Sequence, residues 1–423
     1  MSLGNTRLLF FILILLGTDI VYNIISDVFK FTQPAPYLKE TGHPNEVERK
    51  RSTYLLILAQ PRTGSSFLGQ LFNQHPGVFY LYEPLHPFSM FQTLNYVTEK
   101  GYATLVASFL RSLSRCSLND FQDYVSFLSH PWLSSPHFRL SSKSLSSPPL
   151  CKSEATSFDS QSEILKKCPP LNAKGVSFVC AKKRFIVTKI LTKRLPEVIL
   201  KKLFEQFYSQ AETRFKIIHL VRDPRAMVWS MIKLGLMERG IKNYSTATAY
   251  SNKKLDSTSQ PLRRRNSAIL GHNFIKQVKL LCSRVTKDVN ISLQFSSKSS
   301  ADRYRIVRYE EVASRTLVFA RKIFGFTGID FAPEVKEWLR RNSLFDKNER
   351  SAGERSYSTS NRNITVAVNS WRTSLSFLEA SFVDKECAYF MQNFGYKFID
   401  NVDVLTNISI SLLQPFRKTF YIV

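Results

Sequence analysis

Two stretches of the chain share one pattern: a short run of apolar residues stops at a polar turn and leads into a helical stretch. They span 54–75 and 215–235. Each apolar run is typical of a strand that is buried on both faces of a parallel sheet. The pattern predicts an α/β domain, a three-layer sandwich with a central parallel sheet and ligands at the carboxyl ends of the strands. Further helices are expected near 316–341 and 374–395.

The turn after the first predicted strand carries one guanidinium, one glycine and three hydroxyls, in the run Gln60-Pro61-Arg62-Thr63-Gly64-Ser65-Ser66-Phe67. Gly64 lets the backbone pass close to an anion, and a helix beginning near Ser65 would direct the positive end of its dipole to the same point. The segment predicts a phosphate-binding turn, with an ordinary strand-to-helix connection as the alternative. It resembles the loop with which sulfotransferases hold the 5'-phosphosulfate of PAPS. The segment does not match the Walker A motif of P-loop NTPases, because the first glycine and the lysine of that motif are missing.

The turn after the second predicted strand resembles the 3'-phosphate motif of the same family. There an arginine at the strand end and a serine eight residues later hold the phosphate, and the matching residues here are Arg222 and Ser230. A planar guanidinium can bind a phosphate through two hydrogen bonds. In the alternative interpretation Arg222 and Asp223 only cap a helix that begins at Pro224. The predicted cofactor-binding set is therefore the run 60–67 together with Arg222, Asp223, Pro224, Arg225 and Ser230.

The resemblance narrows to the Golgi galactose, N-acetylgalactosamine and N-acetylglucosamine 6-O-sulfotransferases. The segments that carry it are 70–85, 303–313, Trp338, 357–359, 371–372 and 394–397, so it covers most of residues 52–415. It implies a P-loop-like sulfotransferase fold. The tail 405–413 looks most like chondroitin 6-O-sulfotransferase, with keratan sulfate galactose 6-O-sulfotransferase close behind. The chain departs from the family in having Gln60-Pro61 where Thr-Thr is usual and Trp229 before Ser230.

Sulfuryl transfer requires a base for the acceptor hydroxyl and positive charge for the departing phosphate. Glu83 is the predicted base, because its spacing from Arg62 resembles that of the catalytic glutamate of related Golgi enzymes. Arg62 would offset the charge that develops on the leaving group. Lys189 matches a family lysine that could contact the sulfonate or the acceptor, or else is a solvated lysine at a strand end. His75 and His86 flank Glu83 and rank below it as bases.

An apolar span over 8–25, interrupted by Asp19, resembles a type II signal anchor, with a cleaved signal peptide as the alternative. The expected organisation is a cytosolic tail at 1–7, the anchor, a stem at 26–51, a lumenal sulfotransferase domain at 52–415 with a Ser/Pro-rich loop insertion near 129–170, and a tail at 416–423. The predicted location is the Golgi membrane. In agreement with a lumenal address, there are glycosylation sequons at Asn243, Asn290, Asn363 and Asn407, and six cysteines from which disulfides of unknown connectivity are expected.

The formal net charge of +26 predicts binding to polyanions. The lumenal features and the lack of any recognisable nucleic-acid module favour a glycosaminoglycan or related glycan over nucleic acid. PAPS is the only cofactor expected, and no metal site is predicted from the histidine and cysteine spacing. A nucleotide-dependent kinase and a non-catalytic lumenal polyanion-binding protein are the competing functions. The acceptor stays open among N-acetylgalactosamine, galactose and N-acetylglucosamine.

Overall fold

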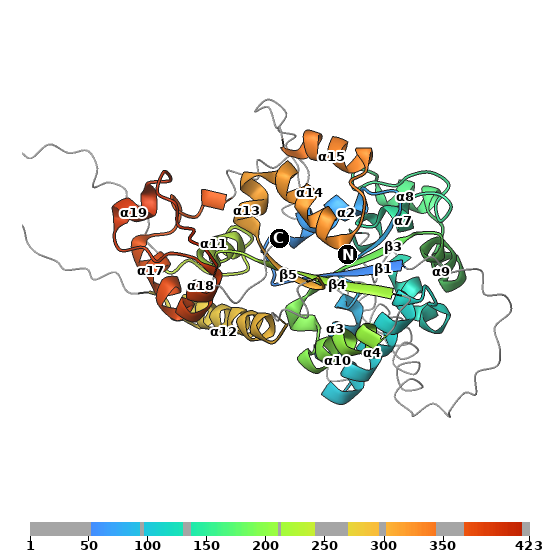
Figure 1. The fold of residues 1–423 in the computed structure, drawn as a ribbon, viewed down its shortest axis with the longest axis horizontal. Helices are drawn as coiled ribbons and strands as arrows, with labels where there is room; N and C mark the ends of the chain where they lie inside the picture. The colour runs from blue at the N-terminus through green and yellow to red at the C-terminus, as the bar shows by residue number, and fades with distance from the viewer. Residues whose placement is uncertain are drawn as a thin grey trace, which may run out of the picture. The chain divides into compact units, whose positions relative to one another are not determined.

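The computed structural model describes residues 52–93, 97–129, 137–209, 213–241, 270–295, 302–343 and 368–416 (Figure 1). The predicted tail, anchor and stem therefore lie outside the described residues, as do Asn243, Asn363 and the segment 357–359. The described chain divides into two compact units. The first contains 52–56 and 72–216, and the second contains 57–71 and 217–416.

Five strands form the sheet of the described residues, in the order β2-β3-β1-β4-β5. Their bounds are β1 Ser52–Ala59, β2 Val78–Tyr82, β3 Phe185–Leu191, β4 Thr213–Val221 and β5 Tyr304–Arg308. β2 pairs in parallel with β3, and β4 pairs in parallel with β5. Every residue of β3 is buried, and so are residues 54–59 of β1. The α/β fold with a central parallel sheet is therefore confirmed, and the burial of β1 and β3 agrees with the inner strands of such a sheet. β3 also buries the polar side chains of Thr188 and Lys189.

The first unit surrounds β2 and β3 with helices. They are α3 His86–Thr93, α4 Glu99–Ser114, α5 Gln122–Ser129, α6 His137–Leu140, α7 Lys143–Ser146, α8 Gln161–Lys167, α9 Ala173–Ala181 and α10 Glu197–Ser209, with the short 3-10 turns η1 Asn119–Phe121 and η2 Thr192–Arg194. α4 packs against α3 and α10, as Figure 1 shows. The side chain of Thr98 caps the first turn of α4 by accepting from the amide of Gly101, and a buried stripe that includes Leu105, Phe109 and Leu113 follows.

The second unit begins with the end of β1 and most of α2 Ser65–Asn73. It continues with α11 Pro224–Lys233, α12 His272–Phe295, α13 Tyr309–Ser314, α14 Thr316–Thr327, α15 Pro333–Ser343, α17 Phe377–Glu386, α18 Ala388–Phe394 and α19 Val402–Thr406. The helices expected near 316–341 and 374–395 are thus present. α14 and α18 each end at a glycine with positive φ, Gly328 at 73° and Gly395 at 71°. α12 packs against α11, α17 and α18.

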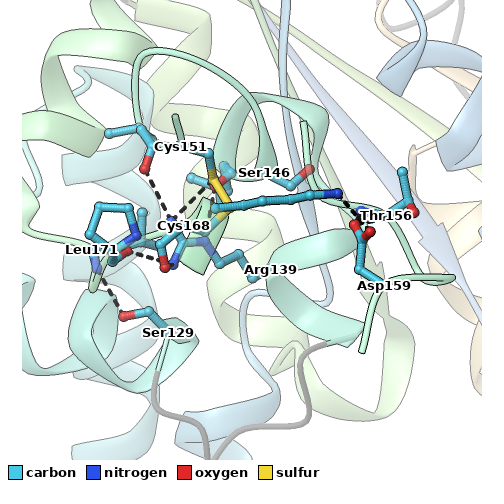
Figure 2. Close-up of a disulfide and its surroundings, with 12 residues drawn as sticks. Ser129, Arg139, Ser146, Cys151, Thr156, Asp159, Cys168 and Leu171 are labelled. Atoms are coloured by element: carbon cyan, nitrogen blue, oxygen red, sulfur yellow. Dashed lines mark hydrogen bonds and ion pairs between the residues drawn. A yellow bond between two sulfur atoms is a disulfide. The ribbon is translucent and has the colours of Figure 1, made fainter. Parts of the chain in front are cut away.

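The Ser/Pro-rich insertion differs from the loop that its composition predicts, because α6, α7 and α8 lie within it. Figure 2 shows the disulfide Cys151–Cys168 beside the guanidinium of Arg139, a residue that is only 4% exposed. That guanidinium donates to the carbonyls of Leu145, Leu150 and Pro169 at 2.8–3.2 Å. A buried arginine that satisfies several backbone carbonyls organises a segment with few large apolar residues, and this arrangement cannot be read from composition.

All six cysteines are paired. Besides Cys151–Cys168, Cys116 bonds to Cys180 in the first unit, and Cys282 of α12 bonds to Cys387 at the end of α17 in the second. The expectation of disulfides is confirmed, and the structure supplies their connectivity.

Among the helices of the described residues, none has the length and apolar character needed to span a bilayer.

Candidate active site

The predicted phosphate-binding turn follows β1 and leads into α2, which begins at Ser65 as expected. Arg62 and Gly64 both have positive φ, 68° and 86°. A Cβ atom added to Gly64 would lie well inside contact distance of the Tyr309 ring. Glycine is therefore required here both by the left-handed backbone and by the aromatic ring packed against it. The hydroxyl of Thr63 donates to the carbonyl of Gln60 at 2.8 Å and closes the turn.

The second predicted turn meets the first within the same unit. Arg222, at the end of β4, donates from Nη1 to the carbonyl oxygen of Arg62 at 2.9 Å. Ser230, on α11, accepts a hydrogen bond from Nε of Arg62 at 3.0 Å. The guanidinium of Arg222 also lies over the Tyr309 ring, 4.5 Å from its centroid. Two segments separated by about 160 residues therefore bring two guanidiniums and a hydroxyl together beside the amino end of α2. This donor set suits phosphate groups.

Three members of the predicted cofactor-binding set make contacts in the interior of the second unit. Asp223 caps α11 by accepting from the amide of Arg225, and Pro224 occupies the first turn of that helix. The fully buried guanidinium of Arg225 donates to both carboxylate oxygens of Asp223 at 2.9 and 2.7 Å and lies 3.0 Å from Asp384. Burial raises the pKa of Asp384 to about 6. These side chains hold the start of α11, which agrees with the alternative that Asp223 caps this helix. Arg222, in contrast, extends to the loop.

The other residues of the loop are also placed by the structure. Phe67 packs against Trp338 of α15, with ring centroids 5.4 Å apart. Thr63 and Ser65 are buried, whereas Pro61, Arg62, Gly64 and Ser66 are partly exposed. The partly exposed groups of the turn thus include the arginine, the glycine and one hydroxyl, which are the groups that an anion would contact.

Glu83 directly follows β2 in the first unit and has a φ of 44°. Its carboxylate forms ion pairs with Nζ of Lys189 and with Nη1 of Arg194. Its amide donates to the carbonyl of Lys189 at 2.9 Å. Lys189 is 2% exposed, and its ammonium lies 4.7 Å from the centroid of the Tyr82 ring. The predicted base and the predicted lysine are therefore direct partners, and the negative charge of Glu83 is matched by two cations.

Backbone conformation marks the same residues independently. Among the described non-glycine residues, positive φ occurs at Arg62, Glu83 and Cys116. Side chains other than glycine, asparagine and aspartate seldom adopt this conformation, and it gathers at functional sites. Two of the three are the predicted charge-offsetting arginine and the predicted base.

The two histidines near Glu83 have other surroundings. Nδ1 of His75 accepts from the amide of Gly77 at 3.0 Å, in the turn that precedes β2. His86 begins α3, where burial and the nearby charge of Lys193 lower its pKa. Its imidazole therefore stays neutral over a wider range of pH than a free histidine.

Sequence reasoning did not identify Arg194 or Tyr309 as site residues. Arg194 lies on η2, beyond the end of β3, and no motif surrounds it. Its role depends on the fold bringing η2 to the end of β2. Tyr309 follows β5 in the run 303–313, a segment that supported the family resemblance without being assigned a role. The sequence feature that could have identified Tyr309 is its place as an aromatic residue directly after β5.

Other predicted sites are placed as follows. Asn290 on α12 and Asn407 after α19 are exposed, as glycosylation requires. Within the described ranges, His, Cys, Asp and Glu form no group of three or more that could hold a metal ion.

Comparison with known proteins is consistent with this geometry. Residues 52–395 match the family described as "Sulfotransferase domain". The chain is 30% identical to carbohydrate sulfotransferase 3 of Mus musculus over 87% of its own length and 73% of that protein. It is 31% identical to carbohydrate sulfotransferase 1 of Danio rerio, covering 88% and 83% of the two chains. The solved structure of mouse sulfotransferase SULT7A1 complexed with PAP aligns with 82% of this chain and 85% of its own, at 16% identity and a TM-score of 0.31. The chain belongs to the sulfotransferase family and is a sulfotransferase enzyme.

Proposed function

We propose that the protein transfers a sulfuryl group from PAPS to the 6-hydroxyl of N-acetylgalactosamine or galactose in a glycosaminoglycan, with chondroitin as the first candidate acceptor. The observation that supports the donor most strongly is the junction of the two predicted phosphate turns. Arg62 donates to Ser230 while Arg222 donates to the carbonyl of Arg62. One set of side chains thereby links the segments proposed for the 5'- and 3'-phosphates.

The described residues fit a donor with phosphate groups at both ends of its ribose. The first turn of α2 offers the positive end of the helix dipole together with the hydroxyl of Ser66, and Arg62 and Arg222 supply charge. PAPS supplies a sulfuryl group attached to a phosphate leaving group. The positive charge of Arg62 would stabilise that phosphate as its charge increases.

The chain must also accept the proton of the acceptor hydroxyl. We assign this role to Glu83, whose pairing with Lys189 and Arg194 favours an ionised carboxylate at the end of β2. A carboxylate that is already ionised can take a proton without first losing one. Lys189 then serves to hold Glu83 in place, and contact between Lys189 and the sulfonate is a less direct role.

The acceptor class is proposed from the relatives and from charge. The relatives are named carbohydrate sulfotransferases, and a formal charge of +26 would concentrate an acidic polysaccharide at the protein surface. Keratan sulfate galactose and N-acetylglucosamine are the alternative acceptors. We place the enzyme in the Golgi membrane, anchored through residues 8–25 with its catalytic domain in the lumen and glycosylated at Asn243, Asn290, Asn363 and Asn407.

The test is transfer of radiolabelled sulfate from PAPS by the purified full-length protein to desulfated chondroitin, keratan sulfate and N-acetylglucosamine-terminated oligosaccharides, with the sulfated position mapped in each product. We expect label at the 6-position of chondroitin N-acetylgalactosamine. Label only in keratan sulfate or in the N-acetylglucosamine-terminated oligosaccharides would change the assigned acceptor and leave the assigned reaction unchanged.

The non-catalytic polyanion binder makes a different prediction in the same assay. It would retain chondroitin sulfate on an affinity column and transfer no label to any acceptor. Failure of the protein to bind PAP, the desulfated product of the donor, would contradict the assignment of the cofactor site itself.

A further inference from the structure

Gln60 is a position at which the chain departs from the motif that it resembles, and its side chain points into the interior of the second unit. It is 2% exposed. Its Nε2 donates to Oδ1 of Asp288 at 3.0 Å and to the carbonyl of Arg284 at 3.3 Å. Both partners are acceptors on α12, so the amide nitrogen, rather than the amide oxygen, faces that helix. Gln60 is thus bound to α12 and is not turned toward a ligand.

The main chain of Gln60 is fixed as well. Its carbonyl accepts from the hydroxyl of Thr63 at 2.8 Å, which closes the turn that presents Arg62 and Gly64. The proline that follows, Pro61, restricts the backbone of Gln60 to extended conformations. The first residue of the anion-binding loop is therefore held through its side chain, its carbonyl and its backbone angles.

Asp288 also depends on its hydrogen bond with the side chain of Gln60. It is 1% exposed, and a buried carboxylate is costly unless donors surround it. One neighbour is the Gln60 amide, and another is His219 of β4, whose Nε2 lies 3.5 Å from Oδ1. Nδ1 of His219 in turn lies 2.6 Å from the hydroxyl of Tyr304 on β5. A buried polar network thus runs from the loop through α12 to two strands, and loss of one member leaves the others unsatisfied.

The element at the far side of this contact is itself cross-linked. Cys282, on α12, forms the disulfide with Cys387. Asp288 therefore belongs to a helix that is tied covalently to the end of α17, and Gln60 binds the loop to that helix.

We propose that Gln60 and Asp288 are positioning residues that preform the anion-binding loop, so that Arg62 and the amides of residues 63–66 are in place before the donor arrives. The consequence for donor affinity rests on the proposed function, whereas the order of the loop does not. A loop that is already ordered binds its ligand without a further loss of conformational entropy. The hydrogen bond between Gln60 and Asp288 should therefore affect donor affinity and the amide hydrogen exchange of the loop rather than proton transfer.

The test uses the full-length protein with Gln60→Glu, Asp288→Asn and the double variant that carries both. Gln60→Glu sets two carboxylates against each other, and we expect PAP affinity to fall about tenfold or more. Asp288→Asn keeps an oxygen acceptor for Gln60 and should cost about threefold. The double variant moves one negative charge from α12 to the loop and restores a donor–acceptor pair, so affinity should return to within a few-fold of the wild type. Amide hydrogen exchange of peptides covering 60–68 should follow the same order, fastest in Gln60→Glu.

The matched control is Gln277→Glu, which adds the same charge to α12 at a side chain that only accepts from the amide of Glu238. It should change neither PAP affinity nor exchange at 60–68. The proposal is overturned if the double variant has the same low PAP affinity and the same fast exchange at 60–68 as Gln60→Glu. It is also overturned if Gln60→Glu has the PAP affinity and the exchange rate of the wild type. If the wild type binds no PAP, the proposed cofactor fails, and the exchange measurements still decide whether Gln60 and Asp288 order the loop.

Discussion

The proposed anion-binding loop of the second unit, residues 60–67, and the Glu83 cluster of the first unit, which is Glu83 with Lys189 and Arg194, are built in different ways. The loop presents donors from consecutive residues, and its geometry depends on backbone conformation, with positive φ at Arg62 and Gly64. The Glu83 cluster joins single side chains from β3, from η2 and from the residue after β2, and depends on charge balance between Glu83, Lys189 and Arg194. Backbone changes should therefore affect the first region most, and changes of charge should affect the second.

Glu83→Gln removes the proposed base and should have the largest effect. We expect kcat to fall about 10³-fold, within the usual range for loss of a general base, while PAP affinity changes by less than about threefold. Initial rates with chondroitin and calorimetric titration with PAP measure the two quantities. Glu99→Gln, at an exposed residue in the first turn of α4, is the control and should keep full activity. Unchanged turnover in Glu83→Gln would remove Glu83 from the mechanism.

Gly64→Ala breaks the loop through its backbone. The new methyl group meets the Tyr309 ring, and φ of 86° is unfavourable for alanine, so PAP affinity should fall about 100-fold. The control is Gly325→Ala in α14, where an added Cβ meets nothing within 4 Å and alanine favours the helix.

A second variant separates the two causes. Gly64→Ala combined with Tyr309→Ala removes the ring and leaves the backbone strain, and Tyr309→Ala alone is its reference because the ring also packs against the Arg222 guanidinium. We expect the double variant to bind PAP more weakly than Tyr309→Ala, and equal affinity would show that φ at residue 64 does not matter.

Arg194→Gln tests charge balance in the Glu83 cluster. With one cation lost, Lys189 alone holds the carboxylate, and kcat/KM for the acceptor should fall about tenfold while PAP affinity is kept. Arg194→Lys should recover part of the loss, because it restores the charge without the planar guanidinium. Arg111→Gln on the exposed face of α4 is the control. A loss of PAP affinity equal to the loss of kcat/KM would refute a role confined to Glu83.

Much of the loop was predictable from the sequence because its determinants are local. An apolar run, a glycine and a serine at the expected helix start gave β1, the turn and α2, and the same reasoning gave Arg222 after β4. The role of Arg225 was not fixed by the motif, because one of its partners, Asp384, lies about 160 residues further along the chain. Asp223 pairs with the same guanidinium. Motif matching assigns a residue to a ligand without seeing which interior group competes for it.

The Glu83 cluster shows the other limit of the sequence. Glu83 and Lys189 were identified by resemblance, but their direct pairing depends on the parallel register of β2 and β3, in which Tyr82 lies opposite Lys189. Arg194 had no signal at all. The helices of the insertion were missed for a related reason, since they depend on Arg139 and a disulfide rather than on an apolar stripe.

Ser230→Ala should have the smallest effect of the set and sharpens the comparison within the loop itself. The hydroxyl contributes one hydrogen bond to Arg62, and in the proposed complex one to a phosphate, so PAP affinity should fall about five- to tenfold with kcat nearly unchanged. Ser314→Ala, at a hydroxyl that bonds only to the carbonyl of Glu311, is the matched control in the same unit. If Ser230→Ala instead lowers kcat as strongly as affinity, Ser230 orients Arg62 during transfer. The loop would then depend on side-chain contacts as much as the Glu83 cluster does.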